Sequence, residues 1–132
     1  MIALDTNLLV RFLVGDNEQQ AKKVYQLFKK TEVNKTELLI PLLVILELIW
    51  VLDSAYDIDR GDILESINDL LLMPIFKFEQ RTVLQKFILS AQQNNYDLSD
   101  LLIAHSAKFQ GSDKTITFDK KAAKHELFEL FQ

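Results

Sequence analysis

Four acidic side chains in this 132-residue chain lie at sequence positions from which they could form one catalytic site. Asp5 and Asp119 each come directly after a short apolar run, and Glu47 and Asp100 lie in segments that we predict to be helical. Clustered carboxylates repel one another, and a bound divalent cation is the usual reason for a protein to hold them together. If the four acids meet at one edge of the fold, they are suited to metal-assisted hydrolysis.

The other residue types narrow the choice of metal and exclude several kinds of site. There is no cysteine, and the two histidines lie twenty positions apart without a His-Glu-x-x-His pattern. No glycine-rich phosphate-binding motif is present, so nucleotide triphosphate and dinucleotide binding lack support. A site built only from oxygen ligands favours Mg²⁺ or Mn²⁺ over zinc, and we expect one of these two as the cofactor.

Each acid also has a purely structural interpretation. Asp5, Asp97 and Asp119 lie at or just before the starts of predicted helices, where an Asp side chain commonly caps the free N–H groups. Asp100 lies one turn further into its helix. Glu47 has apolar neighbours on both sides, so we predict that it is buried and needs a cation, either Lys/Arg or a metal.

Basic and aromatic residues complete the set of candidates. Arg11 is a salt-bridge partner or a contact to a substrate or partner, and the sequence does not rank these roles. Lys120 and Lys121 indicate a solvated helix face or, beside Asp119, a phosphate contact. We expect His105 to be a hydrogen-bonded core or near-site histidine. We expect four aromatic side chains in the core: Trp50, Phe76, Phe78 and Phe118.

Short apolar runs that alternate with helical patterns must position these residues. The runs predict strands at 1–4, 38–40, 75–78, 115–118 and 126–131, and helices at 8–14, 20–30, 43–52, 58–73, 81–93, 97–109 and 119–124. This alternation is typical of an α/β fold with a parallel sheet covered on both faces. Ligand chemistry in such folds gathers beyond the carboxyl ends of the strands, where we expect the acids to converge.

Length and composition predict one soluble domain over residues 1–132. Hydrophobic residues make up 48% and charged residues 26%, which is ordinary for a folded protein. The most apolar stretch, residues 38–52, is too short for a membrane span and contains Pro41 and Glu47. The N-terminal residues do not form a secretory signal, so we expect a cytoplasmic protein without membrane contact.

Four ordered motifs resemble the PIN domain, and most closely the VapC-like ribonuclease toxins of bacterial type II toxin–antitoxin pairs. The motifs are Leu4-Asp5-Thr6-Asn7, Leu46-Glu47-Leu48, the segment Tyr-Asp-Leu-Ser-Asp-Leu-Leu-Ile-Ala at 96–104, and Thr117-Phe118-Asp119. The resemblance implies a three-layer α/β/α fold with a parallel sheet of about five strands. It also implies Mg²⁺ or Mn²⁺ and hydrolysis of RNA phosphodiester bonds.

Carried over residue by residue, the resemblance assigns catalytic and metal-binding roles to Asp5, Glu47, Asp100 and, at the family's more variable fourth position, Asp119. Asn7 and Thr117 match polar positions that support the site, and Asp97 is a cap or a helper. Family members commonly have Asp-Phe-x-Asp-Ala where this chain has Asp-Leu-Ser-Asp-Leu at 97–101, a departure that leaves both acids in place.

The resemblance further implies an RNA substrate, an antitoxin protein that places a basic side chain in the acidic site, and a homodimer. We expect RNA contacts from Arg11, Lys120 and Lys121. Alternatives are a non-catalytic PIN scaffold for protein binding or another small metal-dependent phosphatase or nuclease. A dehalogenase-like phosphatase needs an Asp where this chain has Asn7, and a phosphoreceiver domain needs an acceptor Asp where it has Glu79-Gln80.

Overall fold

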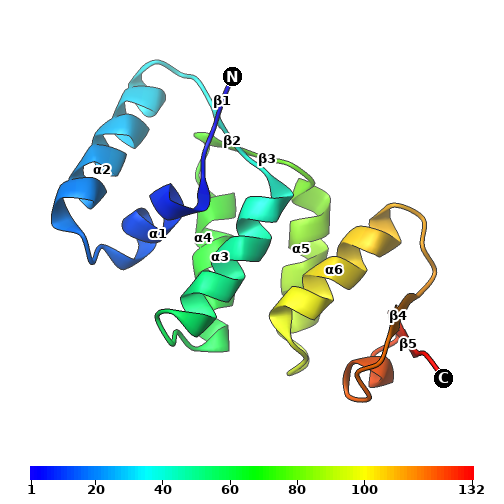
Figure 1. Cartoon of the computed structure of the whole chain (residues 1–132). Coiled ribbons are helices and arrows are strands. Elements are labelled where there is room, and N and C mark those ends of the chain that lie inside the picture. The colour runs from blue at the N-terminus through cyan, green and yellow to red at the C-terminus, as the bar shows by residue number, and fades with distance from the viewer. The chain divides into compact units, whose positions relative to one another are not determined.

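The computed structural model describes all residues from 1 to 132, and it alternates strands and helices as the sequence predicts (Figure 1). The helices are α1 (Thr6–Val14), α2 (Glu18–Val33), α3 (Leu42–Ser54), α4 (Arg60–Leu71), α5 (Arg81–Ala91), α6 (Leu98–Phe109) and the short 3₁₀ helix η1 (Ala122–Lys124). The strands are β1 (Ile2–Ala3), β2 (Leu38–Ile40), β3 (Phe76–Phe78), β4 (Thr115–Thr117) and β5 (Phe128–Leu130).

The chain divides into two compact units, Met1–Glu79 and Gln80–Gln132, and each is described by itself. In the first unit β1, β2 and β3 form a parallel sheet in that order. In the second unit β4 and β5 form a parallel pair. The predicted α/β class and the parallel strands are therefore confirmed. The five strands form a three-stranded and a two-stranded sheet, and the prediction of one domain over 1–132 stays a prediction.

Apolar residues at helical spacing make the core of the first unit. Helix α4 buries one face, which comprises Ile63, Leu64, Ile67, Leu70 and Leu71. Phe28 lies edge-on to Phe76, with ring centroids 5.1 Å apart, and Phe76 lies edge-on to Phe78. These contacts join α2 to β3 and hold the strands that end beside the candidate site residues.

The second unit is smaller. Helices α5 and α6 lie side by side (Figure 1), and α5 buries Val83, Leu84, Phe87, Ile88 and Ala91. A separate apolar cluster joins Ala104 of α6 to Ala122 of η1 and Phe128 of β5. This cluster fixes the segment between β4 and β5, which carries Asp119.

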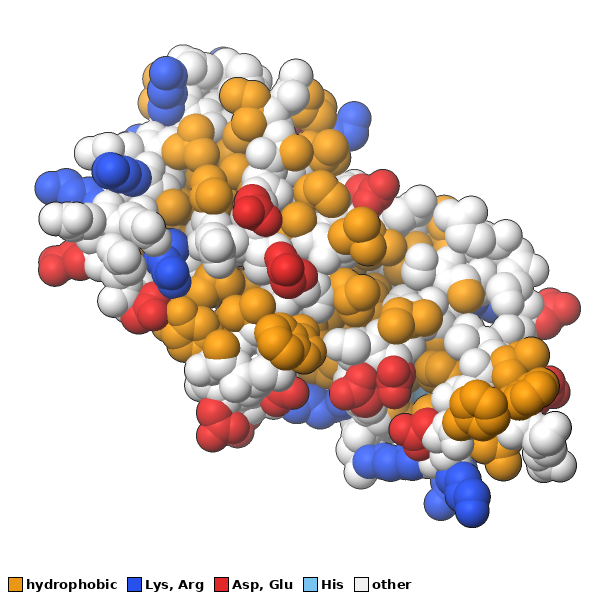
Figure 2. All heavy atoms as spheres, in the orientation of Figure 1, with side chains coloured by type: hydrophobic (Ala, Val, Ile, Leu, Met, Phe, Trp, Pro, Cys, Tyr) orange, Lys and Arg blue, Asp and Glu red, His pale blue; other side chains and the backbone are white.

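Two of the four aromatic residues expected in the core lie on the surface instead. Phe76 and Phe78 are buried as predicted, but Trp50 is 63% exposed and Phe118 is 80% exposed. Trp50 belongs to a helix that is apolar on nearly every side, so its sequence shows no polar face to mark the outside. Phe118 packs edge-on against Phe131 beyond the ends of β4 and β5, where hydrophobic side chains gather at the C-terminal end of the chain (Figure 2).

Strand β1 also differs from expectation, because Ile2 is 66% exposed where we predicted a buried strand. Leu4, the next apolar residue of the same face, is buried. None of the helices has the length and apolar character needed to span a lipid bilayer.

Candidate active site

Asp5 lies between the end of β1 and the start of α1. Its side chain accepts a hydrogen bond of 2.7 Å from the backbone N–H of Thr6, so Asp5 is the N-cap of α1. The carboxylate is nevertheless exposed. The capping interpretation is confirmed, and the exposed position leaves the second oxygen available for a ligand.

Glu47 lies near the middle of α3 and is tied to the start of α1. The hydroxyl of Thr6 donates a hydrogen bond to Glu47 Oε1, across 41 residues of sequence. Thr6 itself is only 3% exposed and is one of two buried polar side chains. Because its backbone N–H also binds Asp5, Thr6 holds the carboxylates of both acids at one place in the first unit.

The prediction that Glu47 is buried was wrong. Glu47 is exposed and lies on one stripe of α3 with the exposed residues Leu43 and Trp50, at positions i, i+4 and i+7. The opposite stripe carries the core residues of the helix. Glu47 therefore needs no buried cation partner, and its second oxygen faces solvent.

Thr6 is the residue that sequence reasoning missed. The only sequence signal was its place between Asp5 and Asn7, where any polar residue fits a helix start. Its role follows from a contact between two distant segments, which local pattern does not reveal.

Two acids of the second unit, Asp97 and Asp119, act electrostatically on a third, Asp100. Asp97 is the N-cap of α6, because its Oδ2 accepts a 2.9 Å hydrogen bond from the backbone N–H of Asp100. Partial burial raises the pKa of the Asp100 carboxyl, and the negative charges of Asp97 and Asp119 raise it further. The repulsion from Asp119 places these two candidate ligands within electrostatic range of each other.

Asp119 lies at the carboxyl end of β4 in a tight turn. Its Oδ1 accepts hydrogen bonds from the backbone N–H groups of Lys121, at 2.8 Å, and Ala122, at 3.1 Å. Thr117 Oγ1 in turn accepts a 3.0 Å hydrogen bond from the backbone N–H of Asp119. Asp119 therefore caps the segment that leads into η1, and Thr117 shapes the turn that presents it. Lys121 Nζ donates to the carbonyl of Asn95 at 3.3 Å.

Arg11 is a salt-bridge partner, which was one of its open interpretations. Its Nη1 lies 3.1 Å from Asp16 Oδ1, and the same nitrogen donates to the Tyr56 hydroxyl at 3.2 Å. The Tyr56 hydroxyl donates to the other oxygen of Asp16. Asn7 is exposed on the same helix and makes no side-chain hydrogen bond.

His105 does not have the hydrogen bond that we predicted for its ring. Its Nε2 is buried without a partner. Burial lowers the pKa of His105, and the nearby positive charges of His125 and Lys86 lower it further against an opposing effect of Glu126. His105 is thus a neutral packing residue at neutral pH.

The candidate ligands of the implied metal are all carboxylates. Neither unit by itself holds three or more Asp, Glu or His side chains placed to bind a metal ion. The first unit holds the carboxylates of Asp5 and Glu47, and the second those of Asp100 and Asp119, all of them oxygen donors of the kind that Mg²⁺ and Mn²⁺ prefer. Convergence of all four stays a prediction.

Asp100→Asn is expected to stabilise the metal-free protein at neutral pH. A folded-state pKa raised above the unfolded one means that the charged carboxylate costs stability at pH 7, and that this cost vanishes below the ordinary pKa of 3.8. Thermal unfolding in a chelator should show a higher Tm for the variant at pH 7 and no advantage near pH 3. Asp113→Asn, an exposed acid in the loop before β4, is the control. A lower Tm at pH 7 would contradict the interpretation.

Comparisons with known proteins show the family of this chain. The sequence profile of the family described as PIN domain matches residues 2–126, which is nearly the whole chain and includes the positions of all four candidate acids. The chain is also similar to a protein from Aquifex aeolicus (strain VF5) named VapC ribonuclease. The two are 27% identical over 124 residues, which cover 94% of this chain and 91% of that protein.

Proposed function

Because the chain belongs to the PIN-domain family, we propose that it is a metal-dependent endoribonuclease and the toxin of a type II toxin–antitoxin pair. The observation that carries this proposal is the arrangement around Thr6, which holds Asp5 and Glu47 together from two distant segments. Asp100 and Asp119 form a second pair of acids, because, in addition to burial, the negative charge of Asp119 raises the pKa of Asp100. The relative named VapC ribonuclease supports the same activity.

Asp5, Glu47, Asp100 and Asp119 would together hold Mg²⁺ or Mn²⁺. Such a cation supplies positive charge that lowers the pKa of water and offsets the negative charge of a phosphodiester. Thr6 fixes the orientation of the Glu47 carboxylate by holding Oε1, which leaves Oε2 for the ligand. Asp97 and Thr117 position Asp100 and Asp119 through the backbone hydrogen bonds that they accept.

Partners follow from the same proposal. An acidic site suits a basic side chain of an antitoxin protein, which would occupy it and block the substrate. We further propose a homodimer and a cytoplasmic location, where RNA is available. Acids are present at all four positions that the resemblance assigns to the site, which favours an active nuclease over a scaffold used only for binding.

A pool of cellular RNA and Mg²⁺ provides the direct test. Purified wild-type protein should produce discrete fragments, and Asp5→Asn should produce none. Asn caps helices about as well as Asp, so this variant keeps α1 and removes only the charge. Equal cleavage by both proteins would indicate a contaminating nuclease, and no cleavage by either would favour the binding scaffold.

A further inference from the structure

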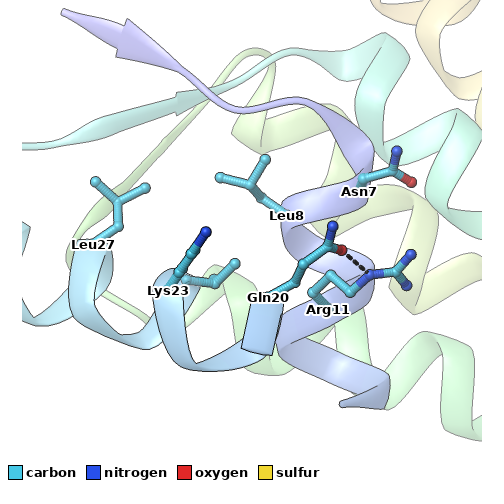
Figure 3. Close-up of a pocket in the computed structure, with 7 residues that line it drawn as sticks. Asn7, Leu8, Arg11, Gln20, Lys23 and Leu27 are labelled. Carbon is cyan, nitrogen blue, oxygen red and sulfur yellow. Dashed lines mark hydrogen bonds between the residues drawn. The ribbon is translucent and has the colours of Figure 1, made fainter. Parts of the chain in front are cut away.

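A cleft of about 430 Å³ lies between α1 and α2 of the first unit (Figure 3). Its volume is in the range of pockets that bind small ligands, roughly 300–1,000 Å³. Side chains of both helices line it, namely Asn7, Leu8 and Arg11 from α1 and Gln20, Lys23, Val24 and Leu27 from α2. The cleft begins two residues after Asp5.

The polar side chains of the cleft suit an anion. No acid lines the cleft, whereas Arg11 and Lys23 both do. The Arg11 guanidinium is held in place, because its Nε donates to Gln20 Oε1 at 2.6 Å (Figure 3) and its Nη1 contacts Asp16 and Tyr56. Figure 3 shows the guanidinium turned away from Lys23. The Lys23 ammonium makes no hydrogen bond or ion pair, so it remains available to a ligand.

The other surfaces of the cleft suit a flat, partly apolar group joined to that anion. Leu8, Val24 and Leu27 provide an apolar wall. The amides of Asn7 and Gln20 add donors and acceptors at its polar end. A nucleotide combines these properties, with a phosphate for Lys23, a base and ribose for the apolar wall, and polar edges for the amides.

Local charge favours a polyanion here. Residues 6–33, which form α1, α2 and their connection, contain five Lys or Arg and three acids, although the whole chain has a net charge of −4. This region is thus one of the few positive ones, and it adjoins an acid of the proposed catalytic site. Positive charge near that site attracts RNA, which the acids themselves repel.

We propose that the cleft between α1 and α2 binds one nucleotide of single-stranded RNA beside the bond that is cut. Lys23 Nζ binds its phosphate, and Leu8, Val24 and Leu27 contact its base and ribose. This assignment rests on the proposed ribonuclease function and adds a substrate-positioning site to it. A base enters the cleft only when it is unpaired, so the cleft selects single strands over duplexes.

Two neighbouring lysines of α2 provide a matched test. Lys22 and Lys23 are both exposed, but only Lys23 lines the cleft. Binding of a 2′-O-methyl RNA oligonucleotide, which resists cleavage, is measured in a chelator for Lys23→Gln and Lys22→Gln. Lys23→Gln should weaken binding about 3- to 10-fold. It should also reduce the slope of log K against log salt concentration by about one, because one fewer counterion is released. Equal weakening by both variants would mean bulk electrostatics and would overturn the proposal.

Methyl NMR locates the bound oligonucleotide. The signals of Leu8, Val24 and Leu27 should shift on titration, while the signal of Ile67, fully buried in α4, should not. If a Glu-rich peptide shifts these three signals and the oligonucleotide does not, the cleft binds protein and the proposal is wrong.

Cleavage assays separate this proposal from the nuclease function. Lys23→Gln should raise KM for single-stranded RNA and leave kcat unchanged. If wild-type protein cleaves RNA and Lys23→Gln has the same KM as wild type, the proposed role of the cleft is wrong and the nuclease function stands. Binding in the cleft without any cleavage would support the cleft and overturn the nuclease function.

Discussion

Glu47→Gln and Asp100→Asn are each expected to lower the rate of RNA cleavage on the order of a thousandfold, or about 4 kcal/mol of activation free energy. Each substitution removes one negative charge from the proposed metal ligands and keeps the size of the side chain. In Glu47→Gln the new amide oxygen can still accept the hydrogen bond from Thr6, so the contact between α1 and α3 survives. Loss of activity in Glu47→Gln would therefore reflect lost charge and not lost structure.

Two further Asp→Asn variants, with smaller expected losses of activity, serve as comparisons for Glu47→Gln and Asp100→Asn. Asp119→Asn should weaken cleavage by only about tenfold. Its amide oxygen still accepts the N–H groups of Lys121 and Ala122, and the resembling family varies most at this position. Asp97→Asn keeps the cap of α6 and should change the rate least. Single-turnover rates on one RNA, with circular dichroism to confirm folding, are the measurements. Full activity in Glu47→Gln or Asp100→Asn would contradict the proposed ligand set.

Removal of divalent cations is expected to abolish cleavage entirely. The proposed site consists of carboxylates, which cannot by themselves bind a phosphodiester or lower the pKa of water. Dialysis against a chelator should leave no measurable rate, and added Mg²⁺ or Mn²⁺ should restore it. Cleavage that persists in the chelator, and that Asp100→Asn does not reduce, would contradict a metal-dependent site.

Metal binding should also stabilise the fold, which gives a readout independent of activity. A ligand at tenfold excess over its Kd stabilises the folded state by about 1.4 kcal/mol. The rise in Tm should be larger at pH 7 than at pH 4, because the ligands must lose their protons and the pKa of Asp100 is raised. Asp100→Asn should reduce this rise. An unchanged Tm in wild-type protein on addition of Mg²⁺ would contradict the proposed site.

Local sequence pattern determined most elements of the fold. The apolar faces of α2 and α4 repeat at helical spacing, and the apolar run at β2 is too short for a helix. Cap residues marked helix starts correctly at Asp5 and Asp97. These signals depend only on residues within a turn or two of each other, so they are readable without knowledge of packing.

Local pattern was misleading where a helix or strand lacked a polar face. Helix α3 is apolar almost all round, so its sequence did not show that Glu47 and Trp50 share an exposed stripe. The interpretation of Glu47 as a buried charge failed for this reason. Burial depends on which neighbours cover a residue, and apolar character alone does not specify them.

The sequence by itself determined the parallel α/β class and the four acids, because strand ends and carboxylates are both visible in local order. The tertiary structure decided how acids are held together and where a ligand fits. Thr6 binds Glu47 across 41 residues, and residues of α1 and α2 together line one cleft. Such contacts arise when helices pack at a particular angle and register. Local periodicity says which face is buried, but it does not say which residues of two faces meet.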